Sequence, residues 1–186
     1  MTIALFGTSA DPPTAAHGDI LQWLSDRYDR ILVWAADNPF KGQQTPLPYR
    51  QAMLNLLVRS LNRPNVEHHP ELSHPYTLYS VEQVKQQWPG ELLTLVVGSD
   101  VLAKLPQWYQ AEKLLGQVQL LVLQRPGVVI APKDWQVVQR LCPHVELANY
   151  CGPAVSSTTY RQQGDTQQLL PAIAQYIQEQ GLYSHP

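Results

Sequence analysis

Short apolar runs alternate along the chain with longer stretches in which apolar residues recur every three or four positions. The apolar runs predict four buried strands, at residues 3–6, 31–34, 92–97 and 120–123, and weaker strands at 66–68 and 145–147. The longer stretches predict helices at about residues 17–26, 48–61, 79–87, 110–115 and 133–141. A last helix is predicted over residues 171–181, where Gly181 is a typical stop.

Strands that alternate with helices indicate an α/β fold. We expect a Rossmann-like, doubly wound parallel sheet with right-handed crossovers and helices on both faces. No repeat, low-complexity segment or linker divides residues 1–186, which predicts a single domain with a C-terminal helical motif. Ligands of such sheets bind beyond the carboxyl ends of the strands, near the point where strand order reverses. The residues that follow each strand are therefore the first candidates for a site.

Composition narrows the class of protein and its partners. Of the 186 residues, 44% are hydrophobic and 15% are charged, which is ordinary for a soluble globular protein. A net charge of −2 does not favour nucleic acid as a partner, and no apolar run is long enough to span a membrane. The first residues lack the pattern of a signal peptide. Cys142 and Cys151 form no C-x-x-C motif, so we expect free thiols and a cytoplasmic protein.

The loop at residues 7–17 carries groups suited to phosphate. Gly7 permits close approach of the backbone, Thr8 and Thr14 supply hydroxyls, and His17 falls at or near the start of a helix. Free N–H groups and the helix dipole at that start favour an anion. No Gly-Lys-Ser/Thr follows, so the loop is not a Walker loop. A plain strand-to-helix loop with a capping histidine is the alternative that this segment leaves open.

Residues 155–161 place four hydroxyl side chains before an arginine. Ser156, Ser157 and Thr158 suit the start of a helix, and its exposed N–H groups form a second anion site. Arg161, one turn further, offers a charged fork for phosphate oxygens. Lys41 follows the second strand and could reach the same crevice. A well-capped surface helix and a solvated lysine remain open as alternatives.

Two further segments carry candidate binding groups. Gly98 and Asp100 follow the strand at 92–97, where a carboxylate can accept hydrogen bonds from both ribose hydroxyls; a helix cap is the alternative. Trp108 and Tyr109 stand in a predicted loop and could stack on a heteroaromatic base, with core packing as the alternative. The remaining histidines, among them residues 68, 69 and 74, lack convincing metal-ligand spacing, so no metal site is predicted in the protein itself.

The order of these segments along the chain resembles that of the nicotinate and nicotinamide mononucleotide adenylyltransferases of the nucleotidyltransferase superfamily. Residues 7–17 are similar to the family's G-G-x-F-x-P-x-H-x-G-H loop, and residues 38–41 to its N-P-x-x-K segment. Residues 75–77 resemble S-Y-T, 97–100 resemble I-G-x-D, 108–109 resemble W-Y, and 123–127 resemble V-x-R-P-G. Residues 155–161 agree with I-S-S-T-x-x-R, allowing Val for Ile. The resemblance therefore runs from about residue 3 to residue 183.

The resemblance implies an adenylyltransferase that joins ATP to nicotinate mononucleotide, forming deamido-NAD and pyrophosphate with the help of Mg²⁺. His17, Arg161 and Lys41 would stabilise the charge of the reacting phosphates. The residues expected to bind ATP are Gly7, Thr8, Thr14, His17, Gly98, Asp100, Ser156, Ser157, Thr158 and Arg161. Those expected at the mononucleotide are Thr77, Trp108, Tyr109 and Arg125, with Trp108 stacking on the pyridine and Thr77 and Tyr109 forming hydrogen bonds.

Several residues depart from the family pattern. Thr14 stands where the family usually has its first histidine; threonine at this position is familiar from phosphopantetheine adenylyltransferases. Ala16 replaces a glycine. Ala10 replaces an aromatic residue, Thr8 replaces the second glycine, and the stretch at 73–75 is shortened. The sequence therefore leaves open nicotinamide mononucleotide or phosphopantetheine as substrate, a cytidylyl product, a non-catalytic nucleotide sensor, and a homo-oligomer.

Overall fold

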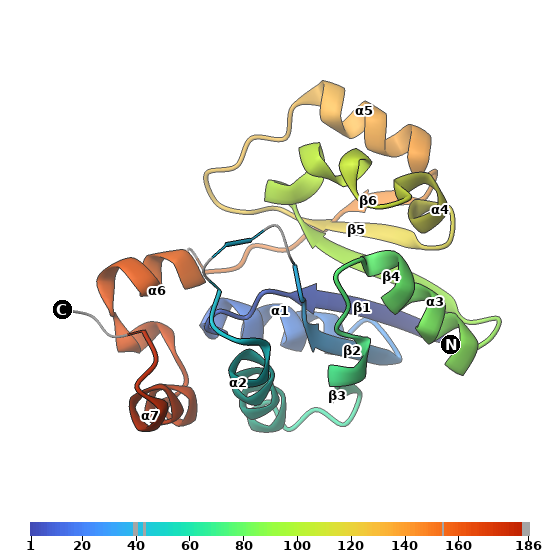
Figure 1. Ribbon diagram of the computed structural model, residues 1–186. Helices are drawn as coiled ribbons and strands as arrows, with labels where there is room; N and C mark the ends of the chain where they lie inside the picture. Colours follow the sequence, from blue (N-terminus) through green and yellow to red (C-terminus); the bar gives the residue numbers. More distant parts are fainter. Residues whose placement is uncertain (39–40, 43, 154, 184–186) are drawn as a thin grey trace.

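A parallel sheet of six strands forms the centre of the computed structural model, which describes residues 1–38, 41–42, 44–153 and 155–183 (Figure 1). The strands are β1 (Thr2–Thr8), β2 (Arg30–Ala35), β3 (Val66–His68), β4 (Leu92–Gly98), β5 (Gln119–Leu123) and β6 (Val145–Leu147). They lie in the order β3-β2-β1-β4-β5-β6, and every neighbouring pair is parallel. The order reverses between β1 and β4, so the binding crevice of such a sheet falls at their carboxyl ends. The predicted α/β fold and all six predicted strands are confirmed.

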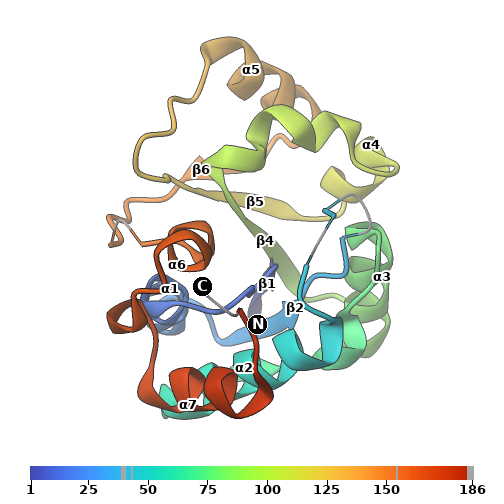
Figure 2. The same ribbon diagram turned by 60° about the vertical axis from the view of Figure 1, so that its left-hand side comes forward.

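Helices cover both faces of the sheet (Figures 1 and 2). One face carries α1 (Ala15–Ser25), α2 (Leu47–Ser60), α6 (Ser157–Gln163) and α7 (Pro171–Gln180). The other carries α3 (Thr77–Gln87), α4 (Ala111–Leu115), α5 (Pro132–Leu141) and the 3₁₀ helix η2 (Ser99–Gln107). Shorter 3₁₀ helices lie at η1 (Pro70–Leu72) and η3 (Thr166–Gln168). Each predicted helix is present, and α1 and α3 begin two residues earlier than predicted.

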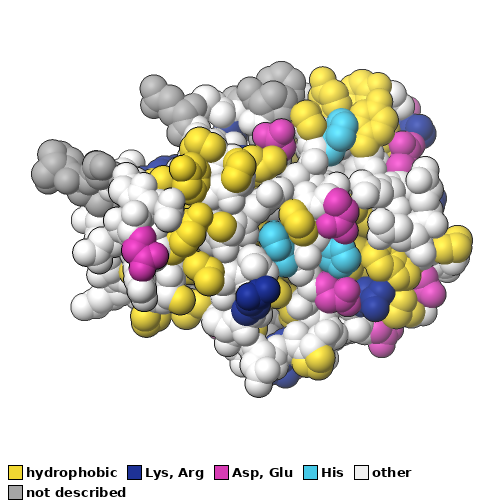
Figure 3. Space-filling view, turned by 60° about the horizontal axis from the view of Figure 1, so that its bottom comes forward, with side chains coloured by type: hydrophobic (Ala, Val, Ile, Leu, Met, Phe, Trp, Pro, Cys, Tyr) yellow, Lys and Arg dark blue, Asp and Glu magenta, His cyan; other side chains and the backbone are white. Residues whose placement is uncertain are grey.

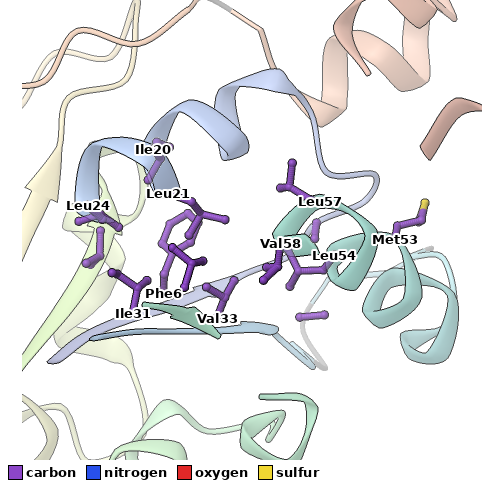
Figure 4. Close-up of a cluster of buried hydrophobic side chains, with 14 of the residues drawn as sticks. Phe6, Ile20, Leu21, Leu24, Ile31, Val33, Met53, Leu54, Leu57 and Val58 are labelled. Atoms are coloured by element: carbon purple, nitrogen blue, oxygen red, sulfur yellow. The ribbon is translucent and has the colours of Figure 1, made fainter. Parts of the chain in front are cut away.

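Alternating side chains of the central strands divide the core in two. In β1, Ala4 and Phe6 point into the core beneath α1 and α2, whereas Ile3 and Leu5 point into the core on the opposite face. Because both faces of the strand are buried, it reads in sequence as a continuous apolar run. Figure 4 shows Phe6 among side chains of α1, α2 and β2, each of them at most 8% exposed. The rigid sheet fixes the positions of the loops that follow its strands.

The segment between β4 and α4 differs from the prediction. The loop predicted at residues 105–109 is helical over its first part, because η2 extends through Gln107. Leu102 and Leu105 are buried at helical spacing against the sheet, which holds this segment in a helix. Trp108 caps the end of η2 and Tyr109 lies in the following turn, as predicted for the two aromatic residues.

Candidate functional site

The phosphate-binding loop predicted at residues 7–17 closes on itself through His17. Thr14 is the N-cap of α1, and His17 is the third residue of that helix. The Thr14 backbone N–H donates to His17 Nδ1 at 3.1 Å, and His17 Nε2 lies 3.1 Å from Thr8 Oγ1. Because Nδ1 accepts, the ring proton is on Nε2, which donates to the threonine hydroxyl. The loop thus presents two hydroxyls and an imidazole N–H in one group.

Burial sets the charge of His17. Its side chain is 6% exposed, and burial together with the nearby Arg125 charge lowers its pKa to about 4. A neutral imidazole is therefore the resting form at neutral pH, and it acts as a hydrogen-bond donor. Gly7 lies just before Thr8, and a Cβ there would come within 2.8 Å of the buried Trp34 ring. Gly7 thus allows β1 to pack closely against the Trp34 ring.

The second predicted anion site, at the start of α6, contacts the first. Ser156 is the N-cap of α6 and accepts from the Thr159 backbone N–H at 3.1 Å. The Ser157 hydroxyl donates to the carbonyl of Pro12 at 2.8 Å, and Arg161 donates to the carbonyl of Asp11. These bonds join segments far apart in the chain, so the starts of α1 and α6 face a common space.

Lys41, Asp100 and Arg125 border the same space. Lys41 Nζ donates to Ser9 Oγ at 2.7 Å, which brings the predicted lysine to the phosphate-binding loop. Burial, with smaller effects of the Arg161 and Arg125 charges, lowers the pKa of Lys41, although Asp100 opposes this shift. Arg125 Nε lies 3.3 Å from Asp100 Oδ1. The side chains of Lys41, Arg125 and Arg161 therefore bring three positive charges together at the carboxyl ends of β1, β2 and β5.

Gly98 leaves room for this pair of charges. A Cβ at Gly98 would lie 2.3 Å from Asp100 Oδ1 and 2.9 Å from Arg125 Nε. The absence of a side chain thus allows the carboxylate and the guanidinium to cross the end of β4. Arg125, predicted at the mononucleotide, lies with the residues predicted for ATP.

A pocket of about 260 Å³ opens between α1, the end of β5 and the segment before α6. It is lined by Ala16, Ile20, Leu123, Gln124, Arg125, Pro126, Tyr150, Gly152, Pro153, Val155, Ser156 and Thr159. Apolar side chains form much of this wall, and Ser156 and Arg125 supply polar edges. Sequence reasoning missed Tyr150, although it follows β6 and obeys the same carboxyl-end rule. The pocket suits a flat apolar group with a polar rim.

Aromatic side chains form a separate group at the start of α3. Tyr109 stacks on Tyr76 with a centroid distance of 4.5 Å and an interplanar angle of 30°. Its hydroxyl also lies 3.4 Å from that of Tyr79. Thr77 is the first residue of α3 and directly follows Tyr76, so the structure brings the predicted Thr77 and Tyr109 together. Trp108 packs instead with its ring partly buried against the core.

Two buried charged residues, neither of them predicted, support the phosphate-binding loop. Arg50 is 2% exposed and donates to the carbonyls of Thr45, Ser9 and Ala36 at 2.7–3.0 Å. Asp11, in the loop itself, is 3% exposed. The sequence assigned neither residue a role, because their hydrogen-bond partners lie in other segments of the chain.

Two of the other histidines that the structure describes, His69 and His74, have structural partners. Figure 3 shows histidine side chains beside acidic ones on one face, and His69 contacts Glu71 at 2.6 Å and Glu67 at 3.2 Å. Among the residues that the structure describes, no three histidine, cysteine or acidic side chains converge as metal ligands. Within the same described residues, none of the helices combines the length and the apolar character needed to cross a membrane.

Comparisons with known proteins agree with this geometry. The family model described as cytidylyltransferase-like matches residues 5–163. A Synechocystis protein named probable nicotinate-nucleotide adenylyltransferase is 41% identical, over 98% of this chain and 99% of its own. The nicotinate-nucleotide adenylyltransferase of Bacillus subtilis is 27% identical over 97% of each chain.

A solved structure shares the fold. The nicotinic acid mononucleotide adenylyltransferase of Plasmodium falciparum, solved in complex with NaAD, superposes with a TM-score of 0.83. Its sequence identity is 19%, and the match covers 98% of this chain and 97% of the other. The likeness therefore extends over the whole sheet and the helices on both faces.

Proposed function

We propose how this site works from the premise that the chain belongs to the cytidylyltransferase-like family and is, within it, a nicotinate-nucleotide adenylyltransferase. The reaction joins nicotinate mononucleotide to the adenylyl group of ATP, releases pyrophosphate and serves NAD biosynthesis. The full-length similarity to relatives of that name removes the support for a phosphopantetheine substrate, a cytidylyl product or a non-catalytic sensor.

The ATP phosphates are assigned to the space between the starts of α1 and α6. On one side, Thr8, Thr14 and His17 offer hydroxyls and the imidazole N–H, next to the free backbone N–H groups of α1. On the other side stand Ser157 and Arg161, whose donors bond to carbonyls of the loop. A phosphate oxygen is a stronger acceptor than a neutral carbonyl, so these side chains can exchange their bonds to the loop carbonyls for bonds to the substrate.

The adenosine moiety is assigned to the 260 Å³ pocket and its border. Ile20, Leu123 and Tyr150 supply an apolar wall for the base. Asp100, free of obstruction by a side chain at Gly98, can accept from the ribose hydroxyls. Arg125 borders this pocket, which favours a role toward ATP over the predicted role toward the mononucleotide.

The mononucleotide is assigned to the aromatic group at the start of α3. Thr77 opens this helix, whose first N–H groups are donors for a carboxylate. Such donors favour nicotinate over the neutral amide of nicotinamide. Tyr109, held against Tyr76, would contribute its hydroxyl, and the part of the Trp108 ring that is not buried against the core would stack on the pyridine.

The chemistry requires alignment and charge stabilisation rather than a strong base. The phosphate of the mononucleotide is already ionised at neutral pH, and its oxygen attacks the α-phosphorus in line with the departing pyrophosphate. Arg161 carries a permanent positive charge, and Lys41 adds an amine beside the same loop. His17 is neutral in the resting site, and the phosphates that approach it favour its charged form and raise its pKa. The three side chains together stabilise the charge that develops on the transferred group.

Magnesium fits this site as a part of the substrate. The described residues hold no cluster of three metal-ligating side chains, whereas Mg²⁺ commonly binds substrate phosphates and retains water ligands. Bound to the triphosphate, Mg²⁺ would neutralise charge on pyrophosphate as it leaves.

The cytoplasm is the compartment that we propose. Cys142 is buried and Cys151 is exposed, and both are free thiols. Free thiols suit a reducing compartment. The substrates ATP and nicotinate mononucleotide are small soluble molecules that require no membrane contact.

One observation carries the assignment of residues: the starts of α1 and α6, with His17 and Arg161, face one space at the strand-order reversal. The test is pyrophosphate release from ATP and Mg²⁺ with nicotinate or nicotinamide mononucleotide, in wild type and His17→Ala. We expect a higher kcat/KM with nicotinate mononucleotide and a loss of about 10²–10³-fold in His17→Ala. A folded His17→Ala protein with wild-type turnover would refute the role of His17.

A further inference from the structure

Tyr183 lies 172 positions from Asp11 in sequence, yet its hydroxyl donates to Asp11 Oδ1 at 2.5 Å. The chain reaches this place because α7 ends at Gly181, whose φ of +61° turns the backbone. The Leu182 N–H then bonds to the carbonyl of Ile177 at 3.0 Å, which fixes the turn. A residue from the last described segment thus reaches the phosphate-binding loop.

Asp11 presents an electrostatic problem for a phosphate site. Its carboxylate is 3% exposed, and it stands in the loop that is proposed to receive an anion. Besides Tyr183, it has the Thr45 backbone N–H at 3.4 Å and Arg161 Nη1 at 3.9 Å from Oδ2. A buried carboxylate without donors draws a nearby cation to itself. Arg161 is the nearest such cation, and it is also the proposed phosphate ligand.

The Tyr183 hydroxyl is well placed to satisfy this carboxylate. Burial, followed by the bond to Asp11, raises the pKa of the Tyr183 phenol, so the hydroxyl keeps its proton and remains a donor. Its ring packs edge-on against Tyr160, with centroids 5.8 Å apart at 88°. Tyr160 is 3% exposed and directly precedes Arg161. The ring is therefore held by packing, independently of the hydroxyl.

We propose that Tyr183 is a positioning residue for ATP binding: its hydroxyl holds the Asp11 carboxylate so that Arg161 stays available to the phosphates. In the structure, Arg161 donates to the backbone carbonyl of Asp11 rather than pairing closely with its carboxylate. Without the hydroxyl, the carboxylate takes Arg161 as its replacement donor, and the guanidinium is withdrawn from the substrate. The inference rests on the proposed assignment of Arg161 to the ATP phosphates.

Tyr183→Phe tests this role because it removes the hydroxyl and keeps the ring. We expect KM for ATP to rise about tenfold, which corresponds to the loss of one hydrogen bond to a charged group. KM for nicotinate mononucleotide should stay within about twofold of the wild-type value, because that substrate does not contact Arg161 in the proposed arrangement. A general loss of structure would raise both constants and lower the midpoint of thermal unfolding. Tyr28→Phe, which removes a hydroxyl before β2 at the opposite ends of the strands, is the matched control and should leave both KM values unchanged.

Asp11→Asn separates this mechanism from simple weakening of the loop. In the Tyr183→Phe background, the neutral amide no longer attracts Arg161, so the double variant should recover most of the affinity for ATP. In the wild-type background, Asp11→Asn should not raise KM for ATP. Asp11→Asn alone therefore tests whether the charge of the Asp11 carboxylate competes for Arg161, even when Tyr183→Phe is too unstable to assay.

The outcomes distinguish this inference from the proposed function. An inactive wild type would refute the function, whereas an active wild type with equal KM for ATP in Tyr183→Phe would overturn only the role of Tyr183. An equal rise in both KM values, or no recovery in the double variant, would overturn it as well. A selective rise that Asp11→Asn reverses would establish it.

Discussion

The buried neutral state of His17 predicts a specific loss of stability in acid. The pKa of this imidazole is lowered from 6.5 to about 4 in the folded protein, first by burial and then by the Arg125 charge. Between these two values the unfolded chain takes up a proton that the folded protein does not. Stability is therefore lost as pH falls below about 6.5, and the loss from this group ends near pH 4. From pH 7 to pH 5, the two pKa values correspond to a loss of about 2 kcal/mol in the free energy of unfolding.

Comparison with His17→Ala isolates this contribution. The variant is expected to be less stable at every pH, because it loses the bond to the Thr14 N–H and leaves a cavity. It nevertheless lacks the titrating group, so its stability should fall by about 2 kcal/mol less than that of wild type between pH 7 and 5. His144→Ala, at an exposed position, controls for the removal of a histidine as such.

Urea unfolding at pH 5, 6 and 7, followed by the fluorescence of the five tryptophans, measures these differences. Curves of stability against pH that run parallel for wild type and His17→Ala would show that the buried imidazole is not held neutral. The description of His17 as a neutral donor in the resting site would then be wrong.

Replacement by alanine should affect different properties at two glycines of the site: the KM for ATP at Gly98 and the stability of the fold at Gly7. In Gly98→Ala the atoms nearest to the new methyl belong to the side chains of Asp100 and Arg125, which can move, so we expect less than about 1 kcal/mol of destabilisation. The displaced carboxylate should raise KM for ATP about tenfold in steady-state assays, and a normal KM would contradict the ribose assignment. In Gly7→Ala the methyl meets the buried Trp34 ring at 2.8 Å, and overpacking there should cost about 2 kcal/mol. Thermal unfolding of the two variants side by side measures this contrast, and equal melting temperatures would refute it.

Local sequence patterns were sufficient for the fold and for selecting candidate groups that the folded chain brings to one edge of the sheet. Continuous apolar runs such as that at residues 92–97 are typical of strands buried on both faces, and all of the predicted strands are present. Hydroxyl residues at helix starts have a local chemical reason, since they cap free N–H groups; Thr14 and Ser156 both occupy N-cap positions. The carboxyl-end rule then located the candidate groups that the structure brings together. Each of these inferences depends on neighbours within a few residues.

The segment after β4 shows where local patterns were insufficient. The proline at position 106 and the aromatic residues that follow it favoured a loop, yet η2 continues through Gln107. Burial of Leu102 and Leu105 against the sheet outweighs that local preference. The placement of Arg125 beside Asp100 likewise depends on the adjacency of β4 and β5, which the sequence does not state.

The sequence by itself determined the type of fold, the order of the elements and the chemistry of the loops, because these depend on periodicity and on residue type. Tertiary structure decided the charge state of His17, since burial and a distant arginine lower its pKa. It also decided the partners of Asp11, which include Arg161 and Tyr183, 150 and 172 positions away. A carboxylate's surroundings depend on which segments fold against it, and no local pattern records that. The proposed role of Tyr183 could therefore come only from the folded chain.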